Sequence, residues 1–185
     1  MVAFIRHAVA RYGREEVGKW RFELWFDADR VKDELYILSY SERFKAIQNI
    51  IHQYSDARIG GSGMHGYVKS TEKKSAYIRA FYKKIRSSGT EPDFMTLYCY
   101  AYDSREENGK IISGPSSDDN FVSHMIDNAE RDQGELLTDR KICLTEWNLT
   151  FSDRNLINDS CFKGATPRPN YIAMLGRVDM AGYFR

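Results

Sequence analysis

Two acid-bearing segments of this sequence have the pattern of strands that deliver carboxylates to a pocket. Glu146 comes near the end of the apolar run 141–147, and an upstream aromatic run, 20–26, is followed by Asp27 and Asp29. Retaining glycosidases hold two carboxyl groups about 5 to 5.5 Å apart, one to attack the anomeric carbon and one to protonate the leaving oxygen. The pattern therefore indicates sugar chemistry, with Glu146 as the candidate nucleophile.

Four motifs, in their order along the chain, resemble the family 39 glycoside hydrolases, the β-xylosidase group. They are Phe22-Glu23-Leu24-Trp25 followed by an acid, the turn-like Arg58-Ile59-Gly60-Gly61, Asp93-Phe94 opening a strand, and Thr145-Glu146-Trp147-Asn148, the most specific of the four. The resemblance covers nearly the whole chain. It implies a start just before the family's fourth barrel strand and an end within the eighth. We therefore expect an α/β fold, a partial (β/α)8 TIM barrel of roughly strands four to eight with a parallel sheet, from a longer protein.

The resemblance also implies which residues would do the chemistry. In active relatives the fourth strand ends Trp-Asn-Glu-Pro, where the asparagine binds the sugar 2-hydroxyl and the glutamate is the acid/base. The same positions here are Trp25-Phe26-Asp27-Ala28. Asp27 thus falls at the acid/base position with a side chain one methylene shorter, and Asp29 is a weaker substitute. Phe26 lacks the hydrogen bond to the 2-hydroxyl, a contact that strengthens in the transition state.

If both acids end strands of one sheet, Asp27 and Glu146 should face a common cleft. We expect their carboxyl carbons to lie within about 5 to 9 Å of each other, toward the wide end because Asp is short.

The sixth strand of the resemblance shows a further departure. Where relatives usually have His and then Tyr two residues later, this chain has Tyr98 and Tyr100. A phenol can hydrogen-bond a sugar, but an ordinary pKa near 10 makes it a poor proton shuttle, so binding would be preserved better than catalysis. The candidate substrate-binding residues are Trp25, Phe26, Tyr98, Tyr100, Trp147 and Asn148. Each aromatic ring among them could equally fill the barrel core. We expect Glu23 to pair with an Arg or Lys inside the barrel, outside the site.

Composition limits the class of protein. The 185 residues carry 27 Lys and Arg against 26 Asp and Glu, and this formal net charge of +1 provides no field to attract nucleic acid or an anionic membrane. Cys99, Cys143 and Cys161 are odd in number and widely spaced, which argues against a disulfide framework and a zinc cluster. The four histidines are scattered, and we interpret each as a surface or helix-packing residue, so we predict no metal and no cofactor. Without an export signal or an apolar run of roughly 18 residues, we expect a single cytoplasmic domain over residues 1–185.

Strand and helix patterns alternate along the chain. Aromatic and β-branched runs predict strands near 20–26, 57–60, 93–100, 141–147 and 178–184. Helical spacing of apolar residues predicts helices from Ser39 to about 56, with Glu42 completing a capping box, from about 70 to Gly89, and near 118–131. At Gly89 we expect a left-handed helix cap. Strand-helix-strand order gives right-handed crossovers and a parallel sheet. We expect the polar segment 103–117 to be a surface loop, or alternatively a lid over a sugar.

Two functions remain open. The first is a retaining β-xylosidase with Glu146 as nucleophile and Asp27 as acid/base. The second is a sugar-binding sensor with weakened catalysis, because barrels similar to family 39 also occur attached to AraC-type transcriptional regulators. Both imply a small sugar or a xylo-oligosaccharide as partner, with no nucleic acid or membrane contacted by this segment.

About five strands are expected where barrel closure needs eight, so the sheet keeps two edges. Parallel sheets are normally protected at their margins, so we predict that the isolated segment self-associates or rearranges locally around its chain ends. A symmetric dimer that joins two partial barrels is the simplest arrangement. Light scattering coupled to size exclusion should then give twice the mass of the chain, whereas a stable monomer at micromolar concentration would show that the chain covers its own edges.

Overall fold

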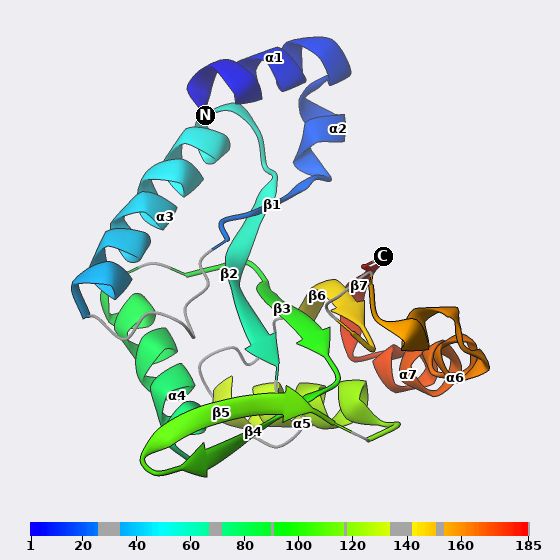
Figure 1. Ribbon diagram of the computed structural model, residues 1–185. Helices are drawn as coiled ribbons and strands as arrows, with labels where there is room; N and C mark the ends of the chain where they lie inside the picture. The colour runs from blue at the N-terminus through cyan, green and yellow to red at the C-terminus, as the bar shows by residue number, and fades with distance from the viewer. Residues whose placement is uncertain are drawn as a thin grey trace.

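A curled sheet of five parallel strands forms the centre of the structure. The computed structural model describes residues 1–25, 34–66, 72–89, 91–116, 118–133, 142–150 and 154–184. The strands are β1 (Arg21–Glu23), β2 (Arg58–Gly66), β3 (Met95–Tyr100), β6 (Ile142–Asn148) and β7 (Val178–Tyr183). They lie in sequence order, and each pairs with the next in parallel (Figure 1). The predicted partial (β/α)8 barrel is therefore confirmed as a half-barrel.

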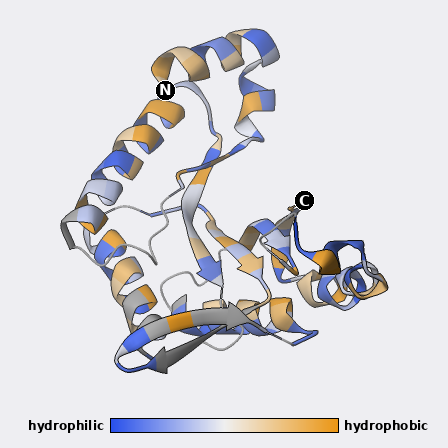
Figure 2. Cartoon of the chain, viewed as in Figure 1, coloured by the Kyte–Doolittle hydropathy of each residue, from blue (hydrophilic) through white to orange (hydrophobic). Residues whose placement is uncertain are grey.

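Three long helices alternate with these strands. They are α3 (Glu34–Tyr54), α4 (Glu72–Ser87) and α5 (Phe121–Gln133). Each contributes buried apolar side chains to one core with the strands: Phe44, Ile51, Phe81, Ile85, Phe121 and Met125. Hydrophobic and hydrophilic residues accordingly alternate along these helices in Figure 2. The three predicted helices are confirmed, and Gly89 follows α4 with the expected left-handed φ of 70°.

The predicted start of the first long helix is wrong. Helix α3 begins at Glu34, so Ser39 lies inside it and cannot form an N-terminal capping box with Glu42. The helix extends further back because Ile37 and Tyr40 already belong to its buried face. The Tyr40 hydroxyl also donates to the Leu24 carbonyl at 3.0 Å, which fixes this end of the helix beside β1.

The amino-terminal segment, for which we had no prediction, forms two helices. These are α1 (Val2–Tyr12) and α2 (Arg14–Gly18). Ile5, Ala8 and Val17 make a separate small core against which Trp20 and Tyr54 pack. The two helices therefore attach the start of β1 to the end of α3. No helix within the described ranges is long and apolar enough to cross a bilayer.

The glycine run 60–63 lies within β2 and is not the turn that the motif suggested. Its glycines admit close neighbours. A Cβ on Gly60 would collide with the Phe94 ring, and one on Gly63 would lie 2.8 Å from the Trp25 ring. Gly63 also has a φ of 68°, a conformation that glycine adopts without strain. The run thus lets β2 pass directly beside two aromatic rings.

The polar segment after β3 is a β-hairpin, so the expected surface loop is wrong in form. Strands β4 (Tyr102–Glu107) and β5 (Lys110–Pro115) pair antiparallel. Asn108 and Gly109, with φ values of 51° and 72°, make the two-residue turn. Asn-Gly is the strongest short hairpin signal, and the turn was visible in the sequence although the strands were not predicted. The hairpin lies beyond the carboxyl end of β3 (Figure 1).

An ion pair joins the two edge strands across the concave side of the sheet. The guanidinium of Arg21 on β1 lies 2.8 Å from the carboxylate of Asp179 on β7, and Arg58 lies 4.0 Å from the same carboxylate. The Arg21 and Asp179 side chains are only 23% and 20% exposed. Because the partners belong to the first and last strands, this interaction requires the sheet to be curled.

The helical segment before β7 was also not predicted. It contains the 3-10 turn η2 (Leu156–Asp159), helix α6 (Cys161–Ala165) and helix α7 (Pro167–Met174). The side chains of Asn155 and Ser160 cap the first two elements by accepting from backbone N–H groups. All three cysteines are free, with Cys99 and Cys143 buried and Cys161 exposed.

Replacing Asp179 with Asn should destabilise the fold by about 1 to 3 kcal/mol, because it leaves the half-buried Arg21 without its charged partner. The matched control is Asp56→Asn, which breaks an exposed pair with Arg14 whose side chains are 53% and 81% exposed. We expect the control to cost less than about 0.5 kcal/mol. Urea unfolding followed by tryptophan fluorescence measures both, and equal costs would contradict a role for the edge-strand pair.

Candidate functional site

Glu146 lies on the concave side of the half-barrel near the carboxyl end of β6. Its register partner on β3 is Tyr98, and the pairing shifts by one residue just before this point, so Thr145 is an extra residue in β6. Such a bulge changes the direction of neighbouring side chains. Both Thr145 and Glu146 therefore reach inward, Thr145 to β1 and Glu146 to β3.

Tyr100 holds the Glu146 carboxylate. Its hydroxyl donates to Oε2 of Glu146 at 2.9 Å. Burial, followed by the hydrogen bond and charge of Glu146, raises the pKa of Tyr100 well above the ordinary tyrosine value. Tyr100 therefore remains a donor at neutral pH, and its ring is held edge-on against Phe184 after β7. One oxygen of Glu146 is fixed in this way, which sets the orientation of the other.

Trp25, Tyr98 and His65 form a continuous stack beside Glu146. The ring centroids of Trp25 and Tyr98 are 5.3 Å apart at 22°, and those of His65 and Tyr98 are 4.9 Å apart at 16°. Two rings thus stack on Tyr98, which is 5% exposed. Tyr98 therefore offers little surface to a sugar. Trp25, 43% exposed, offers the open ring.

His65 was interpreted from the sequence as a surface or packing histidine, but it is buried on the wall of the site. It pairs in register with Tyr98 on the neighbouring strand. Relatives are expected to have an imidazole on β3, at the position of Tyr98. In this chain an imidazole is present beside that position, but β2 carries it. Neither periodicity nor spacing in the sequence could align residues of two strands in this way.

Glu23 lies in the barrel interior, beneath Glu146. Its described hydrogen-bond partner is Thr145, and not the Arg or Lys that we expected. The Thr145 hydroxyl donates to Oε1 of Glu23 at 3.4 Å. Burial raises the pKa of Glu23, the Thr96 and Thr145 hydroxyls lower it, and the charge of Glu146 raises it again, with a net upward shift. A second carboxyl group therefore lies close enough to Glu146 to feel its charge.

Trp147 and Asn148, both predicted to bind substrate, have their described contacts elsewhere. Trp147 is 1% exposed and packs edge-on against Tyr171 of α7 and Tyr183 of β7. Asn148 is also buried, and its amide donates to the Phe184 carbonyl. These contacts attach the end of β6 to β7 and α7.

Phe26 and Asp27 lie outside the described residues, as do Ala28 and Asp29. The expected separation of the Asp27 and Glu146 carboxyl groups therefore stays a prediction. The described part of β1 ends at Glu23, and Trp25 beyond it is already stacked on the site wall. Within the described ranges, no group of three or more His, Cys, Asp or Glu side chains could hold a metal ion.

The comparisons with known proteins agree with this architecture. The sequence model of the family described as Glycosyl hydrolases family 39 matches residues 1–168. A GH39 enzyme from Xanthomonas axonopodis pv. citri is 24% identical with a TM-score of 0.74, and a monomeric beta-xylosidase from Caulobacter crescentus CB15 is 24% identical with a TM-score of 0.70. A glucosidase from Croceicoccus marinus is 16% identical with a TM-score of 0.64. No curated protein matches the sequence.

These three structures are much longer than the chain. The alignments cover 99%, 99% and 100% of this chain, but 36%, 37% and 36% of the other chains. The chain thus spans just over a third of the length of these structures. At such identities the structural likeness establishes the fold, and the family match rests on the sequence.

The variant Glu23→Gln should become more stable relative to the unmodified chain as pH rises. A carboxyl group with a raised pKa binds more protons when folded than when unfolded. The unmodified fold therefore loses stability as pH rises from the unfolded value, about 4.3, to the folded one, by about 1.4 kcal/mol per unit of pKa difference. Glutamine does not titrate. Urea unfolding at a series of pH values between 4 and 8 measures the difference.

A second variant tests the cause of the shift. Thr145→Val removes a hydroxyl that lowers the pKa of Glu23. It should extend the loss of stability to higher pH. If the free energies of unfolding of Glu23→Gln and the unmodified chain differ by the same amount at every pH, the raised pKa of Glu23 is contradicted.

Proposed function

Because this chain belongs to family 39 of the glycosyl hydrolases, we propose that it carries the two catalytic carboxyl groups of a retaining β-xylosidase-like enzyme. The observation that supports this most directly is the Glu146 carboxylate, fixed by the Tyr100 hydroxyl at the carboxyl end of a barrel strand. Active sites of such barrels are built at this end of the strands. Glu146 is the proposed nucleophile and Asp27 the proposed acid/base.

The proposed reaction has two steps. Glu146 attacks the anomeric carbon and forms a covalent glycosyl-enzyme while Asp27 gives its proton to the leaving oxygen. Asp27 then takes a proton from a water molecule that attacks the same carbon, which releases the sugar and restores Glu146. The exposed Trp25 ring would support the apolar face of the sugar, and Tyr98 and Tyr100 would contact it at their edges.

The departures at positions 26 and 27 predict slow chemistry. Asp27 places the proton donor about one C–C bond further from the leaving oxygen than a glutamate would, and a displacement of that size can cost about 100-fold in rate. Phe26 cannot hydrogen-bond the 2-hydroxyl. Trp25, by contrast, retains an open ring for binding.

A sugar sensor is the second candidate, and the buried Tyr98 favours it. At the position where catalytic relatives are expected to have an imidazole, this chain has a buried phenol on which the Trp25 and His65 rings stack. Such a wall can be rigid and bind a ligand without transferring protons. We propose that, in this case, the segment would be the ligand-binding part of an AraC-type regulator acting on a small sugar or xylo-oligosaccharide.

Restoring the family residues separates the two candidates. The double variant Phe26→Asn and Asp27→Glu should hydrolyse aryl β-xylosides at least about 100-fold faster than the unmodified protein, because it recovers the donor position and the 2-hydroxyl contact. Release of the aryl group measures the rate.

The control adds Glu146→Gln to the double variant and should abolish the gain. An unmodified protein that already turns over about once per second or faster would overturn the sensor. A double variant with no gain would contradict the roles given to positions 26 and 27.

A further inference from the structure

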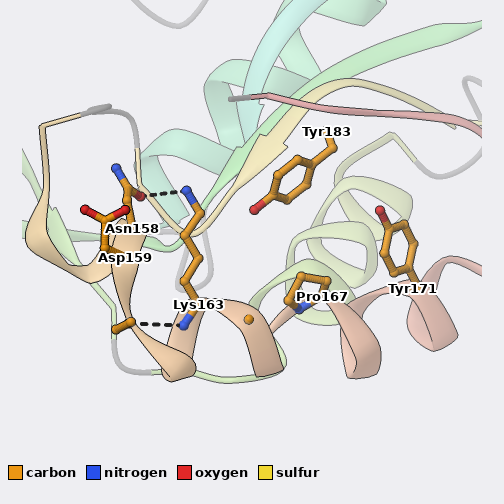
Figure 3. A pocket seen from close by; sticks show the side chains of 8 residues that line it. Asn158, Asp159, Lys163, Pro167, Tyr171 and Tyr183 are labelled. Atoms are coloured by element: carbon orange, nitrogen blue, oxygen red, sulfur yellow. Dashed lines mark hydrogen bonds between the residues drawn. The ribbon is translucent and has the colours of Figure 1, made fainter.

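We propose that a pocket outside the barrel, between the helical segment 156–174 and the end of β7, binds a unit of a neutral saccharide. The pocket has a volume of about 490 Å³, within the range of small-molecule sites. Figure 3 shows polar side chains on one side and two tyrosines on the other. Its main lining residues are Asn158, Asp159, Ser160, Lys163, Tyr171 and Tyr183.

The two tyrosines provide an ordered aromatic surface. Tyr171 is 50% exposed and Tyr183 is 43% exposed, so both present ring surface to a ligand. Each is fixed edge-on to Trp147, with centroids 5.2 Å and 5.0 Å away. The Tyr183 hydroxyl also donates to Oδ1 of Asn148 at 3.3 Å. Rings that are held in this way bind with little loss of side-chain entropy.

The polar side of the pocket is charged but balanced, and it is also held in place. Lys163 Nζ and the Thr150 hydroxyl both donate to Oδ1 of Asn158, at 2.6 Å and 3.0 Å. The Lys163 backbone N–H donates to the Ser160 hydroxyl oxygen at 3.3 Å. With one cation, Lys163, and one anion, Asp159, the pocket favours neither charge sign in a ligand. Aromatic rings opposite balanced polar groups suit a neutral, hydroxyl-rich molecule.

The pocket is coupled to Glu146 through the strand that carries it. Both tyrosines contact Trp147, which directly follows Glu146 in the sequence. Asn148, the next residue, accepts the hydrogen bond from the Tyr183 hydroxyl. Tyr183 is the last residue of β7, so the pocket lies near the carboxyl ends of the strands, as Glu146 does. We assign it as a remote subsite for an oligosaccharide. The saccharide class rests on the proposed function.

Titration of the isotope-labelled protein with xylotriose, followed by backbone amide NMR, tests the subsite. We expect saturable shifts at Lys163 and Gly164. The variant Tyr171→Ala should bind xylotriose at least 10-fold more weakly, as measured at these two amides. The matched control is Tyr12→Ala, since Tyr12 is 52% exposed and packs against Trp20 at 5.5 Å, far from the pocket. The control should leave the binding unchanged.

A second variant and a second ligand make the outcome decisive. Asp159→Ala, at an exposed side chain, should also weaken binding without affecting the fold. Sulfate should not saturate the pocket, and saturation by sulfate in place of xylotriose would overturn the neutral-ligand assignment. Unchanged xylotriose binding in both pocket variants would overturn the subsite.

The amides of Tyr100 and Glu146 report the inner site separately. Shifts there without shifts at Lys163 and Gly164 would overturn the subsite and leave the proposed function intact. Shifts only at the pocket would leave the subsite as a sugar site and contradict the proposed function. No shift at either place would overturn both.

Discussion

The side chains that cross the concave side of the sheet are the constraint on which the half-barrel and its site depend. They come from alternate positions of β1 and meet the far strands at successive levels. Arg21 pairs with Asp179 of β7, and Glu23 accepts from Thr145 of β6. These contacts join the first strand to the last two, so five strands are held in a curve. Barrels fill their interiors in such layers.

The geometry of Glu146 follows from this interior. A regular strand would alternate its side chains between the two faces, so Thr145 and Glu146 could not both turn inward. The extra residue in β6 permits it: Thr145 binds Glu23 in the lower layer while Glu146 reaches Tyr100 above. The ion pair, the carboxyl group beneath and the candidate nucleophile are thus parts of one arrangement. A change at Glu23 should therefore be felt at Glu146.

The sequence could predict those features that depend on local pattern or on a specific motif. Strand and helix alternation, the left-handed Gly89 and the family resemblance led to the correct fold class. Prediction failed where a contact between distant segments decides the structure. The glycine run was expected to be a turn, because the sequence does not show that it packs against Trp25, which follows β1, and Phe94, which precedes β3. The positions of His65 and Glu23 could not be predicted, because only strand register places them beside Tyr98 and Thr145.

Contacts between distant segments also explain why the site remains packed although its sequence departs from the family motif. Tyr98 is a larger ring than the histidine expected at this position, but it is accommodated in the wall, where the Trp25 and His65 rings stack on it. Gly63 allows the Trp25 ring to approach β2 closely enough to complete the stack. Stacked rings of this kind contribute roughly 0.5 to 1.5 kcal/mol per pair beyond their buried area. The wall thereby gains rigidity beside Glu146, which supports the proposal of a sugar sensor with weakened catalysis.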